Sequence, residues 1–391
     1  MAQTILSSAG RNSPYPLREL CGWSHDQKEN TMNIGIAGGG LLGRLCAWRL
    51  LREGCQVTLF EAGSLTTCPG AARTAAAMIS PLSELVDSDR TVYDMGMHSL
   101  QLWPQWLAQL QQPVHYYDGG SLVTAHRQDQ GLLNQFANTL QHKLGENGYQ
   151  WLNQAQLQAQ EPDLSHFSQA LYLPAEAYVD NHALLDQLLA DITAMGGTLH
   201  EHCAVELLQD NRICSSHGID TFDHVLDCRG IGAKQALPQL RGVRGEVMWV
   251  QTREVQLQRP VRFMHPRYKL YIVPKPDHQF IIGATEIESE DMSAISLRSN
   301  LELSSALYAV SPAFAEARIT RTDVNLRPAL LNNHPQILVQ GRCLRANGLY
   351  RHGYLLAPMM VEAVLDRLLQ RQHSPFMEQL LRTTQPEAVT P

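Results

Sequence analysis

A glycine-rich turn followed at a distance by an acidic residue is the part of this chain best suited to chemistry. The turn, Gly38–Gly43, fits the pattern G-x-G-x-x-G, and Glu61 lies about 20 residues beyond it. In this pattern Gly38 allows a tight turn, Gly40 lets a pyrophosphate approach the backbone, and Gly43 lets a helix pack on a strand. The Glu61 carboxylate can accept hydrogen bonds from a ribose 2′-OH. We therefore predict a dinucleotide site, because a ligand-free glycine turn would leave Glu61 unexplained.

The elements around this turn support the same prediction. The apolar run 33–37 is typical of a buried strand, residues 41–53 carry apolar side chains at helical spacing, and 57–60 is typical of the next strand. The N-terminus of such a helix offers backbone N–H groups and the positive end of the helix dipole to phosphates. A glycine pattern alone is weak evidence, whereas the complete strand–turn–helix–strand–acid unit is specific.

Composition narrows the class of protein. The chain has 391 residues, a length that predicts two sequential or interleaved domains. Its net charge of −7 gives no reason to expect nucleic acid as a partner. The eight cysteines form no C-x-x-C pair and no zinc spacing, which is typical of a reducing cytoplasm, and no apolar run is long enough to span a membrane. We expect residues 1–31, a polar stretch, to be a disordered extension.

The chain beyond the first unit alternates predicted helices and strands. The strand 225–230 runs into a glycine turn, the usual ending of a nucleotide-facing strand. Alternating runs between 243 and 285 predict an antiparallel sheet. The nucleotide-binding unit therefore resumes late in the sequence, after an interruption by a different region. We expect helices at 89–112, 127–148, 154–161, 182–195, 298–308 and 355–371.

Several further segments carry a family resemblance. They are Thr74–Met78, Arg244–Glu246, Tyr271–Pro274, Ile282–Thr285, Leu326–Pro328 and Tyr350–Pro358. Together with the opening turn they stand in the order found in one family and cover roughly residues 32–372. On these segments the chain resembles the D-amino-acid oxidase family of flavoproteins, and within it the glycine oxidases of thiamin biosynthesis.

The resemblance implies a mixed α/β fold, in which a Rossmann-type FAD-binding domain is interleaved with a substrate-binding domain on a large mixed sheet. The implied boundaries are 32–115, 176–240 and 320–391 for FAD, and 116–175 and 241–319 for the substrate. Non-covalent FAD would accept hydride from the α-carbon of glycine or a similar small amine acid, such as sarcosine or a small D-amino acid. The imine would hydrolyse to an oxo acid and ammonia, and O2 would reoxidise the flavin to give hydrogen peroxide. Neither nucleic acid nor a membrane is an expected partner, and a homo-oligomer is compatible with the family.

The same resemblance indicates where FAD would bind. Backbone N–H groups at the start of the last helix would lie by the pyrimidine edge of the flavin, where a helix N-terminus stabilises negative charge on the reduced ring. The implied cofactor-binding residues are Gly38, Gly40, Leu42, Gly43, Glu61, Thr74, Ala76, Val205, Gly230, His352, Gly353, Tyr354 and Leu355.

An amino acid substrate carries a carboxylate, and the planar fork of an arginine binds both of its oxygens at once. Arg327 matches the family's carboxylate-binding arginine, and Tyr271 matches a tyrosine whose hydroxyl donates to the same carboxylate. Arg351 matches an active-site arginine, and Met78 and Ser80 match positions beside the flavin. Other roles stay open: a surface salt bridge for Arg327, a core position for Tyr271, and a solvent-exposed helix start for Arg351.

Two residues depart from the family pattern. Lys269 stands where the better-known glycine oxidases have a histidine, and Glu286 stands where an apolar residue is expected. A buried, unpaired Glu286 would be costly, so we expect it to have a partner or to be exposed. The departures leave the exact substrate open. A flavoprotein that modifies a protein or tRNA, a redox-silent flavin-binding scaffold, and NAD as the dinucleotide also stay open, although Arg351–Pro358 favours a flavin.

Overall fold

Two large β-sheets and two small ones carry the fold in the computed structural model, which describes residues 31–67, 70–145, 148–267 and 269–383. The predicted extension over residues 1–31 lies outside the described residues, apart from Thr31. The other described residues belong to one compact unit that begins at Met32. Within the described ranges, none of the helices combines the length and the apolar character that crossing a bilayer requires.

The seven-stranded sheet contains the unit predicted from the glycine pattern. Its strand order is β21–β19–β20–β13–β1–β2–β9, and neighbours are parallel except β19 and β20. Ile34, Gly35, Ile36 and Ala37 are all buried, because parallel strands are covered on both faces. The strands are β1 (Asn33–Ala37), β2 (Gln56–Phe60), β9 (Thr198–His200), β13 (His224–Asp227), β19 (Gln336–Gln340), β20 (Cys343–Asn347) and β21 (Leu381–Thr383).

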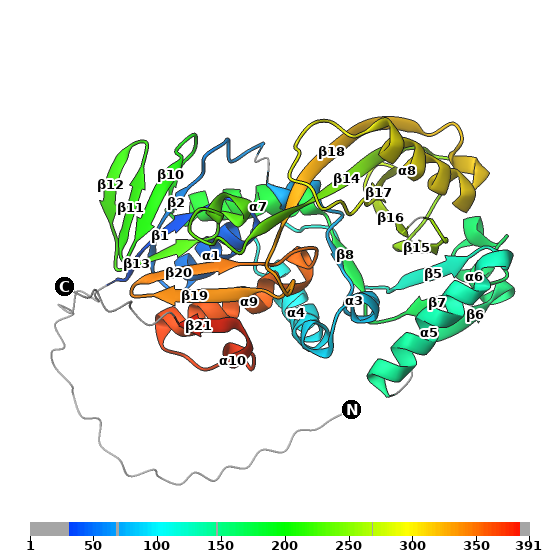
Figure 1. Ribbon diagram of the computed structural model, residues 1–391, viewed down its shortest axis with the longest axis horizontal. Helices are drawn as coiled ribbons and strands as arrows, with labels where there is room; N and C mark the ends of the chain where they lie inside the picture. Colours follow the sequence, from blue (N-terminus) through cyan, green and yellow to red (C-terminus); the bar gives the residue numbers. More distant parts are fainter. Residues whose placement is uncertain (1–30, 68–69, 146–147, 268, 384–391) are drawn as a thin grey trace, which may run out of the picture. The chain divides into compact units, whose positions relative to one another are not determined.

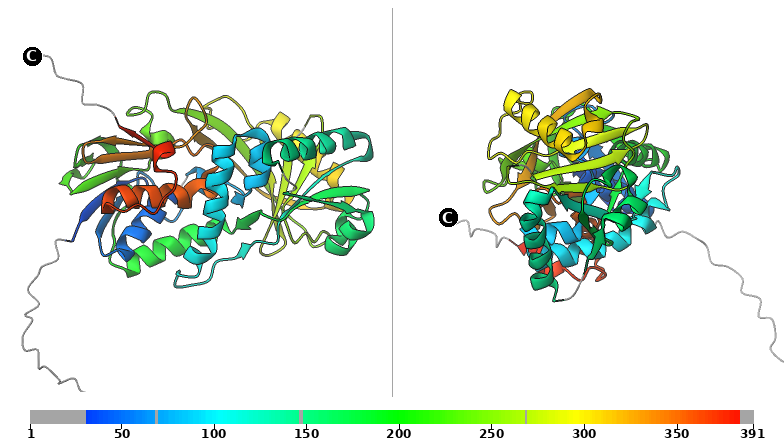
Figure 2. Two further views of the ribbon diagram at one scale, coloured as in Figure 1. Left: turned by 90° about the horizontal axis from the view of Figure 1, so that it is seen from below. Right: turned by 90° about the vertical axis from the view of Figure 1, so that its right-hand side faces the viewer.

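Helices α1 (Leu41–Arg52), α4 (Arg90–Leu107), α7 (Asn181–Ala194) and α9 (Gly353–Leu369) belong to this part of the fold. Helix α9 packs against α1 and α4, and α1 also packs against α7 (Figures 1 and 2). Almost all of α9 is buried, so it forms the centre of the largest apolar core together with α1 and β1. This core fixes where the first turn of α9 lies.

The eight-stranded sheet has the order β18–β14–β17–β16–β15–β5–β7–β6. Neighbours are antiparallel except β15 and β5. Helix α8 (Leu297–Val310) covers one face, and α5 (Gln130–Leu144) packs on β5 and β7. The strands are β5 (Ser121–Ala125), β6 (Gln150–Asn153), β7 (Gln169–Leu173), β14 (Arg241–Gln251), β15 (Val261–Met264), β16 (Lys269–Lys275), β17 (Gln279–Gly283) and β18 (Arg318–Ala329).

Alternation along β16 decides which side chains can reach a ligand. Leu270 and Ile272 pack in the same core as α8, whereas Tyr271 and Val273 belong to a cluster on the opposite face. Successive side chains of a strand point to opposite faces of the sheet, so Lys275 shares the face of Tyr271. This face is the one that Tyr271 brings to the candidate site.

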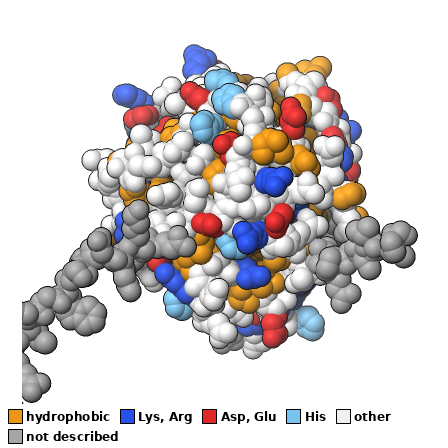
Figure 3. Space-filling view, turned by 90° about the vertical axis from the view of Figure 1, so that its left-hand side faces the viewer, with side chains coloured by type: hydrophobic (Ala, Val, Ile, Leu, Met, Phe, Trp, Pro, Cys, Tyr) orange, Lys and Arg blue, Asp and Glu red, His pale blue; other side chains and the backbone are white. Residues whose placement is uncertain are grey.

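Two small sheets and several short elements complete the described chain. Figure 3 views the end of the molecule at which β10, β11 and β12 lie, and on this face basic side chains are mixed with acidic ones. Such a surface lacks the basic stripe expected of a nucleic-acid site. The elements are β3 (Met78–Ile79), β4 (Tyr116–Tyr117), β8 (Ala177–Val179), β10 (Val205–Gln209), β11 (Arg212–Ser215), β12 (Gly218–Thr221), α2 (Ala71–Thr74), α3 (Pro81–Asp87), α6 (Gln154–Gln160) and α10 (Met377–Leu380).

The mixed α/β fold class is confirmed, and the antiparallel strands predicted between 243 and 285 are β14 to β17. The sequence did not predict β10, β11, β12 or β18. All of β12 and the first four residues of β18 are exposed, so neither shows the apolar alternation on which strand prediction depends. The division into an FAD domain and a substrate domain remains our proposal. Strand β18, which spans the proposed boundary at 320, pairs with β14 in the eight-stranded sheet.

Candidate active site

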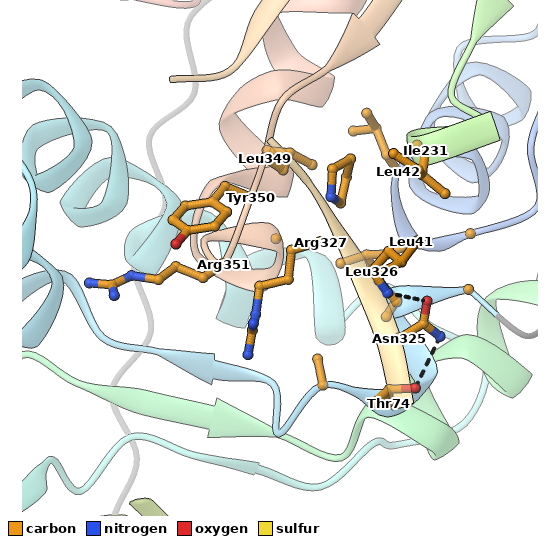
Figure 4. A pocket seen from close by; sticks show the side chains of 18 of the residues that line it. Leu41, Leu42, Thr74, Ile231, Asn325, Leu326, Arg327, Leu349, Tyr350 and Arg351 are labelled. Atoms are coloured by element: carbon orange, nitrogen blue, oxygen red, sulfur yellow. Dashed lines mark hydrogen bonds between the residues drawn. The ribbon is translucent and has the colours of Figure 1, made fainter. Parts of the chain in front are cut away.

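A cavity of about 650 Å³ lies where residues of both large sheets meet. Its walls come from the glycine turn, from the segment 70–78, from β18, and from the residues that precede and begin α9 (Figure 4). Cavities of about 300–1,000 Å³ are typical of small-molecule sites. Of the residues predicted to bind cofactor or substrate, all except Gly43 line this cavity.

Three glycines of the turn have different structural roles. Gly38 has a φ of 103°, which favours glycine. A Cβ added at Gly43 would stand 1.9 Å from the Gly38 carbonyl oxygen, so Gly43 serves the packing of α1 on β1. A Cβ added at Gly40 would meet no atom of the described residues within 4 Å, so the backbone there borders open space. A phosphate can therefore approach the N-terminus of α1 at Gly40.

Glu61, at the end of β2, holds the turn closed. Its Oε2 accepts a hydrogen bond from the Gly39 N–H at 2.7 Å, and its Oε1 accepts one from the Gly63 N–H at 2.9 Å. The residue also lines the cavity. The carboxylate thus shapes the turn, and its contact with a ribose remains a prediction.

Arg44 supports the same turn and was not predicted. Its side chain is fully buried in the first turn of α1, and its Nε donates to the Gly39 carbonyl oxygen at 2.7 Å. Its Nη1 donates to the Leu185 carbonyl oxygen of α7 at 2.7 Å, and its Nη2 donates to the Leu65 carbonyl oxygen. A charged residue directly after the last glycine, in the otherwise apolar run 41–48, is the sequence signal that could have identified it.

The start of α9 opens onto the cavity. A hypothetical Cβ at Gly353 has no atom of the described chain within 4 Å, and the cavity is lined by His352, Gly353, Tyr354 and Leu355. The N–H groups of His352 and Leu356 are used inside the protein, where they donate to the carbonyl oxygens of Leu349 and His352. Of the predicted residues at the start of this helix, His352 therefore does not offer its N–H group to the cavity. The N-terminus of this 17-residue helix still directs its positive dipole end into the cavity.

These features fit a flavin dinucleotide. Two helix N-termini open onto one cavity, α1 at the glycine turn and α9 beside the predicted substrate arginines. The first suits a pyrophosphate, and the second suits the negative charge of a reduced flavin ring. Gly230, with a φ of 54°, adds a third close-approach position, since among the described residues only Pro328 lies within 4 Å of its hypothetical Cβ.

Arg327 projects from β18 into the cavity, as Figure 4 shows. Its Nη1 donates to the Arg244 carbonyl oxygen at 3.2 Å, and its Nη2 donates to the Thr285 carbonyl oxygen at 3.0 Å. A Cβ added at Gly245 would lie 2.5 Å from Nη2, so the guanidinium lies flat across this glycine. Within the described residues Arg327 forms no salt bridge with an acid. Its positive charge is held in place by neutral carbonyl groups.

A buried ion pair supports these carbonyl groups. Arg244 is paired with Glu246, with 2.7 Å between Nη2 and Oε1. The Thr285 hydroxyl donates to Oε2 of Glu246 at 3.0 Å and accepts the Glu246 N–H at 3.0 Å. Burial alone would raise the pKa of Glu246, but hydrogen bonds from Ser299, Arg244 and Thr285 hold it below its usual value. The ionised pair therefore keeps Arg244 and Thr285 in place behind Arg327.

Tyr271 lies next to this arginine. A Cβ added at Gly283 of the adjacent strand would be 2.8 Å from the Tyr271 hydroxyl oxygen. Burial raises the pKa of Tyr271, so its hydroxyl keeps its proton at neutral pH. No hydrogen bond joins this hydroxyl to another described residue. It is consequently a donor that faces the cavity.

Arg351 is placed differently from Arg327. Figure 4 shows its side chain pointing away from that of Arg327. It donates to Glu84 at 2.8 Å, to Asp87 at 3.1 Å and to Glu286 at 3.3 Å. Three carboxylates thus surround one guanidinium. Although Arg351 lines the cavity, its donors are used by the protein, which favours a role in organising the site over direct binding of a substrate carboxylate.

Glu286 was expected either to have a partner or to be exposed, and in the structure it has partners and is also partly exposed. Its side chain is 48% exposed, and it accepts hydrogen bonds from the Tyr350 hydroxyl at 2.7 Å and from Arg351. Lys269, the other departure from the family pattern, lies in β16, but its side chain is outside the described part of the structure.

A network around Glu84 was not predicted from the sequence. Oε2 of this carboxylate lies 3.2 Å from Nδ1 of His352, and Oε1 lies 4.0 Å from Nη2 of Arg262. Burial would raise the pKa of Glu84, but His352, Arg351 and Arg262 together hold it far below its usual range. Glu84 and Asp87 follow the predicted residues Met78 and Ser80 closely, and this spacing is the only local signal for them.

Thr74, Ala76, Met78 and Ser80 lie in the wall made by α2 and the segment that follows it. Asn325 of β18 donates to the Thr74 hydroxyl at 3.1 Å (Figure 4). Nζ of Lys275 donates to the Ala76 carbonyl oxygen at 3.0 Å. Met78 and Ser80 lie in this wall, and the buried Ser80 hydroxyl has no described partner. Neither Asn325 nor Lys275 was predicted, because both contacts join segments far apart in the sequence.

Val205 lines a different part of the cavity, together with Glu61 and Gly230.

The described residues contain no group of three or more His, Cys, Asp or Glu side chains that could hold a metal ion. The geometry instead combines a dinucleotide cradle with an arginine and a tyrosine hydroxyl. This combination is what binding of a flavin and a small anion requires.

Residues 33–367 match the sequence model of the family described as DAO: FAD dependent oxidoreductase. The chain belongs to this family, and it is therefore an FAD-dependent oxidoreductase with FAD as its cofactor. The match confirms the resemblance found in the sequence, and it supports FAD, and not the alternative NAD, as the dinucleotide.

Individual relatives narrow the comparison. The chain is 39% identical to the putative thiamine biosynthesis oxidoreductase ThiO of Rhizobium etli over 350 residues, which cover 88% of this chain and 98% of that protein. It is 25% identical to the glycine oxidase of Geobacillus kaustophilus over 370 residues, which cover 88% of this chain and 94% of that protein. A crystal structure of glycine oxidase from Bacillus cereus has the same fold, with a TM-score of 0.77, 23% identity, and coverage of 90% and 99%.

Proposed function

We propose that this chain is an oxidase of glycine or a similar small amine acid, such as sarcosine or a small D-amino acid. The observation that carries the proposal is the placement of Arg327. Its guanidinium projects into the cavity and donates hydrogen bonds to two carbonyl oxygens. It has no acidic partner among the described residues. An uncompensated charge of this kind suits the carboxylate of an amino acid.

The side chains divide the work of the reaction. Arg327 binds and orients the carboxylate, and the Tyr271 hydroxyl donates a further hydrogen bond to it. FAD, when bound, supplies the acceptor for the hydride of the α-carbon. The amine must be neutral when the hydride leaves, and this step needs no strong side-chain base. The positive end of α9 stabilises negative charge at the cofactor.

The products follow from atom balance. Loss of a hydride and a proton converts the amine to an imine, and water converts the imine to an oxo acid and a free amine, which is ammonia when the substrate is a primary amine. Two electrons and two protons then reduce O2 to hydrogen peroxide. The names of relatives support this reading, since one is called a glycine oxidase and another a thiamine biosynthesis oxidoreductase. We propose a role in thiamine biosynthesis on the same basis.

The test uses the purified holoprotein. Under nitrogen, glycine or sarcosine should bleach the yellow flavin, and admission of air should restore the colour with release of hydrogen peroxide. The oxo acid should appear in an amount equal to that of the released amine, which is ammonia from glycine and methylamine from sarcosine. An unchanged flavin spectrum with every small amine acid tried would contradict the proposal, although the chain would remain an FAD-dependent oxidoreductase.

A further inference from the structure

The three arginines beside the predicted substrate position differ in how their N–H donors are used. Arg351 donates to three carboxylates, and Arg327 donates to two carbonyl oxygens. Arg262 of β15 also lines the cavity, but within the described residues its guanidinium makes no hydrogen bond, and its buried Nε has no partner. A guanidinium carries five N–H donors, and buried donors are nearly always satisfied. Arg262 therefore lacks an acceptor that a ligand or water must supply.

The acids around Arg262 do not satisfy it. Glu84 is the nearest, at 4.0 Å, and this carboxylate already accepts a 2.8 Å hydrogen bond from Arg351. Glu176 is buried, accepts hydrogen bonds from Ser83 and Ser121, and has a pKa raised by burial, which favours its neutral form. The Arg262 side chain is itself only 17% exposed. A deep positive charge therefore faces the cavity without a hydrogen-bonded anion.

The register of the eight-stranded sheet aligns this charge with the predicted carboxylate site. Arg262 is paired with Tyr271 across β15 and β16, and Tyr271 is paired with Gly283 across β16 and β17. Directly paired residues of neighbouring strands place their side chains on the same face. Arg327 reaches the same face from the far side, where it contacts the Thr285 carbonyl just beyond Gly283. The donors thus stand in the order Arg327, Tyr271, Arg262 across the strands.

We propose that this row binds small amine acids that carry a second carboxylate. Arg327 and Tyr271 hold the first carboxylate, and Arg262 pairs with the second. The second carboxylate can be attached to the nitrogen, as in iminodiacetate, or to the side chain, as in D-aspartate. This inference rests on the proposed amine-acid oxidase function and specifies its substrate class.

Two matched pairs of substrates test the inference on the wild-type holoprotein. Iminodiacetate is sarcosine with an added carboxylate, and D-aspartate is D-alanine with an added carboxylate. We expect kcat/KM to be higher for the dicarboxylate in at least one pair, and the pair that shows the preference identifies where the second carboxylate is attached. A preference for the monocarboxylate in both pairs would overturn the inference and leave the amine-acid oxidase function intact.

Variants assign the preference to one side chain. In Arg262→Met, the ratio of kcat/KM for the preferred dicarboxylate to that for its monocarboxylate partner should fall about 10- to 100-fold, the effect of a lost charge-assisted hydrogen bond. Arg262→Lys, which keeps the charge but not the fork, should restore part of the ratio. Arg253→Met, at an exposed arginine between β14 and β15, controls for the loss of a positive charge.

The measured ratios of kcat/KM distinguish a role of Arg262 in substrate binding from the alternatives. A ratio that stays the same in Arg262→Met would show that water satisfies Arg262 and that its charge serves only Glu84, which overturns the inference. If Arg262→Met does not fold, Arg262→Lys and the wild-type pairs still decide the matter. Failure of all four compounds and of glycine to reduce the flavin would overturn the proposed function, and the inference with it.

Discussion

Arg327 and Arg351 show how neighbours decide what an arginine can do. Both line one cavity, yet Arg351 lies among three carboxylates and Arg327 is held by two carbonyl oxygens. Charge-assisted hydrogen bonds are the stronger kind, so the carboxylates keep Arg351 occupied. Arg327 keeps a charge that an incoming anion can neutralise. The chemistry of the site therefore depends on the partners of each residue as much as on the residue type.

Replacement of Arg327 by Ala should weaken substrate binding by about 1.5–3 kcal/mol or more, because the substrate carboxylate would lose its charged partner. Arg327→Lys should lose less, since the charge remains without the planar fork. The measurement is the dissociation constant of glycine from flavin reduction under nitrogen. Arg318→Ala is the matched control, on the same strand with a 79% exposed side chain. An effect of Arg327→Ala as small as that of the control would mean that Arg327 does not bind the substrate carboxylate.

At the scale of elements, the glycine turn joins β1 to α1 through contacts that are too close to admit a larger side chain at Gly43. The Gly43 position lies against the Gly38 carbonyl, and Arg44 and Glu61 hold Gly39 from two sides. The turn is therefore fixed by backbone, by a buried guanidinium and by a carboxylate from the next strand. Its rigidity keeps the N-terminus of α1 aimed into the cavity.

Gly43→Ala should destabilise the fold by about 1–3 kcal/mol or more, because the new Cβ would stand 1.9 Å from a backbone oxygen that cannot move aside. FAD should bind more weakly to whatever folded protein remains. Gly131→Ala is the control: Gly131 lies in α5 with no atom within 4 Å of its hypothetical Cβ, so alanine there should stabilise by about 0.5–1 kcal/mol. Chemical unfolding and FAD titration measure both effects, and equal stability of the two variants would refute the packing argument.

At the scale of the whole molecule, Lys275 joins parts that are distant in the sequence. Its buried Nζ donates to the carbonyl oxygens of Ala76 at 3.0 Å and Val179 at 2.8 Å, and no salt bridge to it is present in the described ranges. The Tyr178 ring lies 5.4 Å from Nζ. This one side chain ties β16, which carries Tyr271, to the wall that contains Ala76 and to β8.

The pH dependence of global stability should reveal this contact. Burial lowers the pKa of Lys275 from its ordinary 10.5 to about 7. Between these values the unfolded chain binds one proton more than the folded protein, so stability increases as the pH rises above about 7. The difference in unfolding free energy between wild type and Lys275→Met should therefore grow with pH, by up to about 1.4 kcal/mol per pH unit.

Urea unfolding at several pH values from 7 upward measures this difference. Lys234→Met, at a lysine with a 49% exposed side chain, controls for the loss of one positive charge. A difference between wild type and Lys275→Met that does not vary with pH would mean that Lys275 keeps its proton in the folded protein.

The sequence by itself determined the nucleotide-binding unit, and its resemblance to a flavoprotein family indicated FAD as the cofactor. A strand, a glycine turn, a helix and an acidic residue lie within about 30 residues, so their geometry is set by local chain sterics and hydrogen bonds. The sequence predicted that Gly38, Gly40 and Glu61 bind the cofactor, and in the structure all three line one cavity. The packing role predicted for Gly43 agrees with its position outside the lining.

Only the tertiary structure decided which side chains are satisfied and which are not. The three acids around Arg351 come from α3 and from the loop after β17, and the alignment of Arg262 with Tyr271 depends on the register of β15 and β16. A shift of one residue in that register would turn Arg262 to the other face of the sheet. Register and long-range pairing follow from packing of the whole core, so no local pattern in the sequence could reveal them.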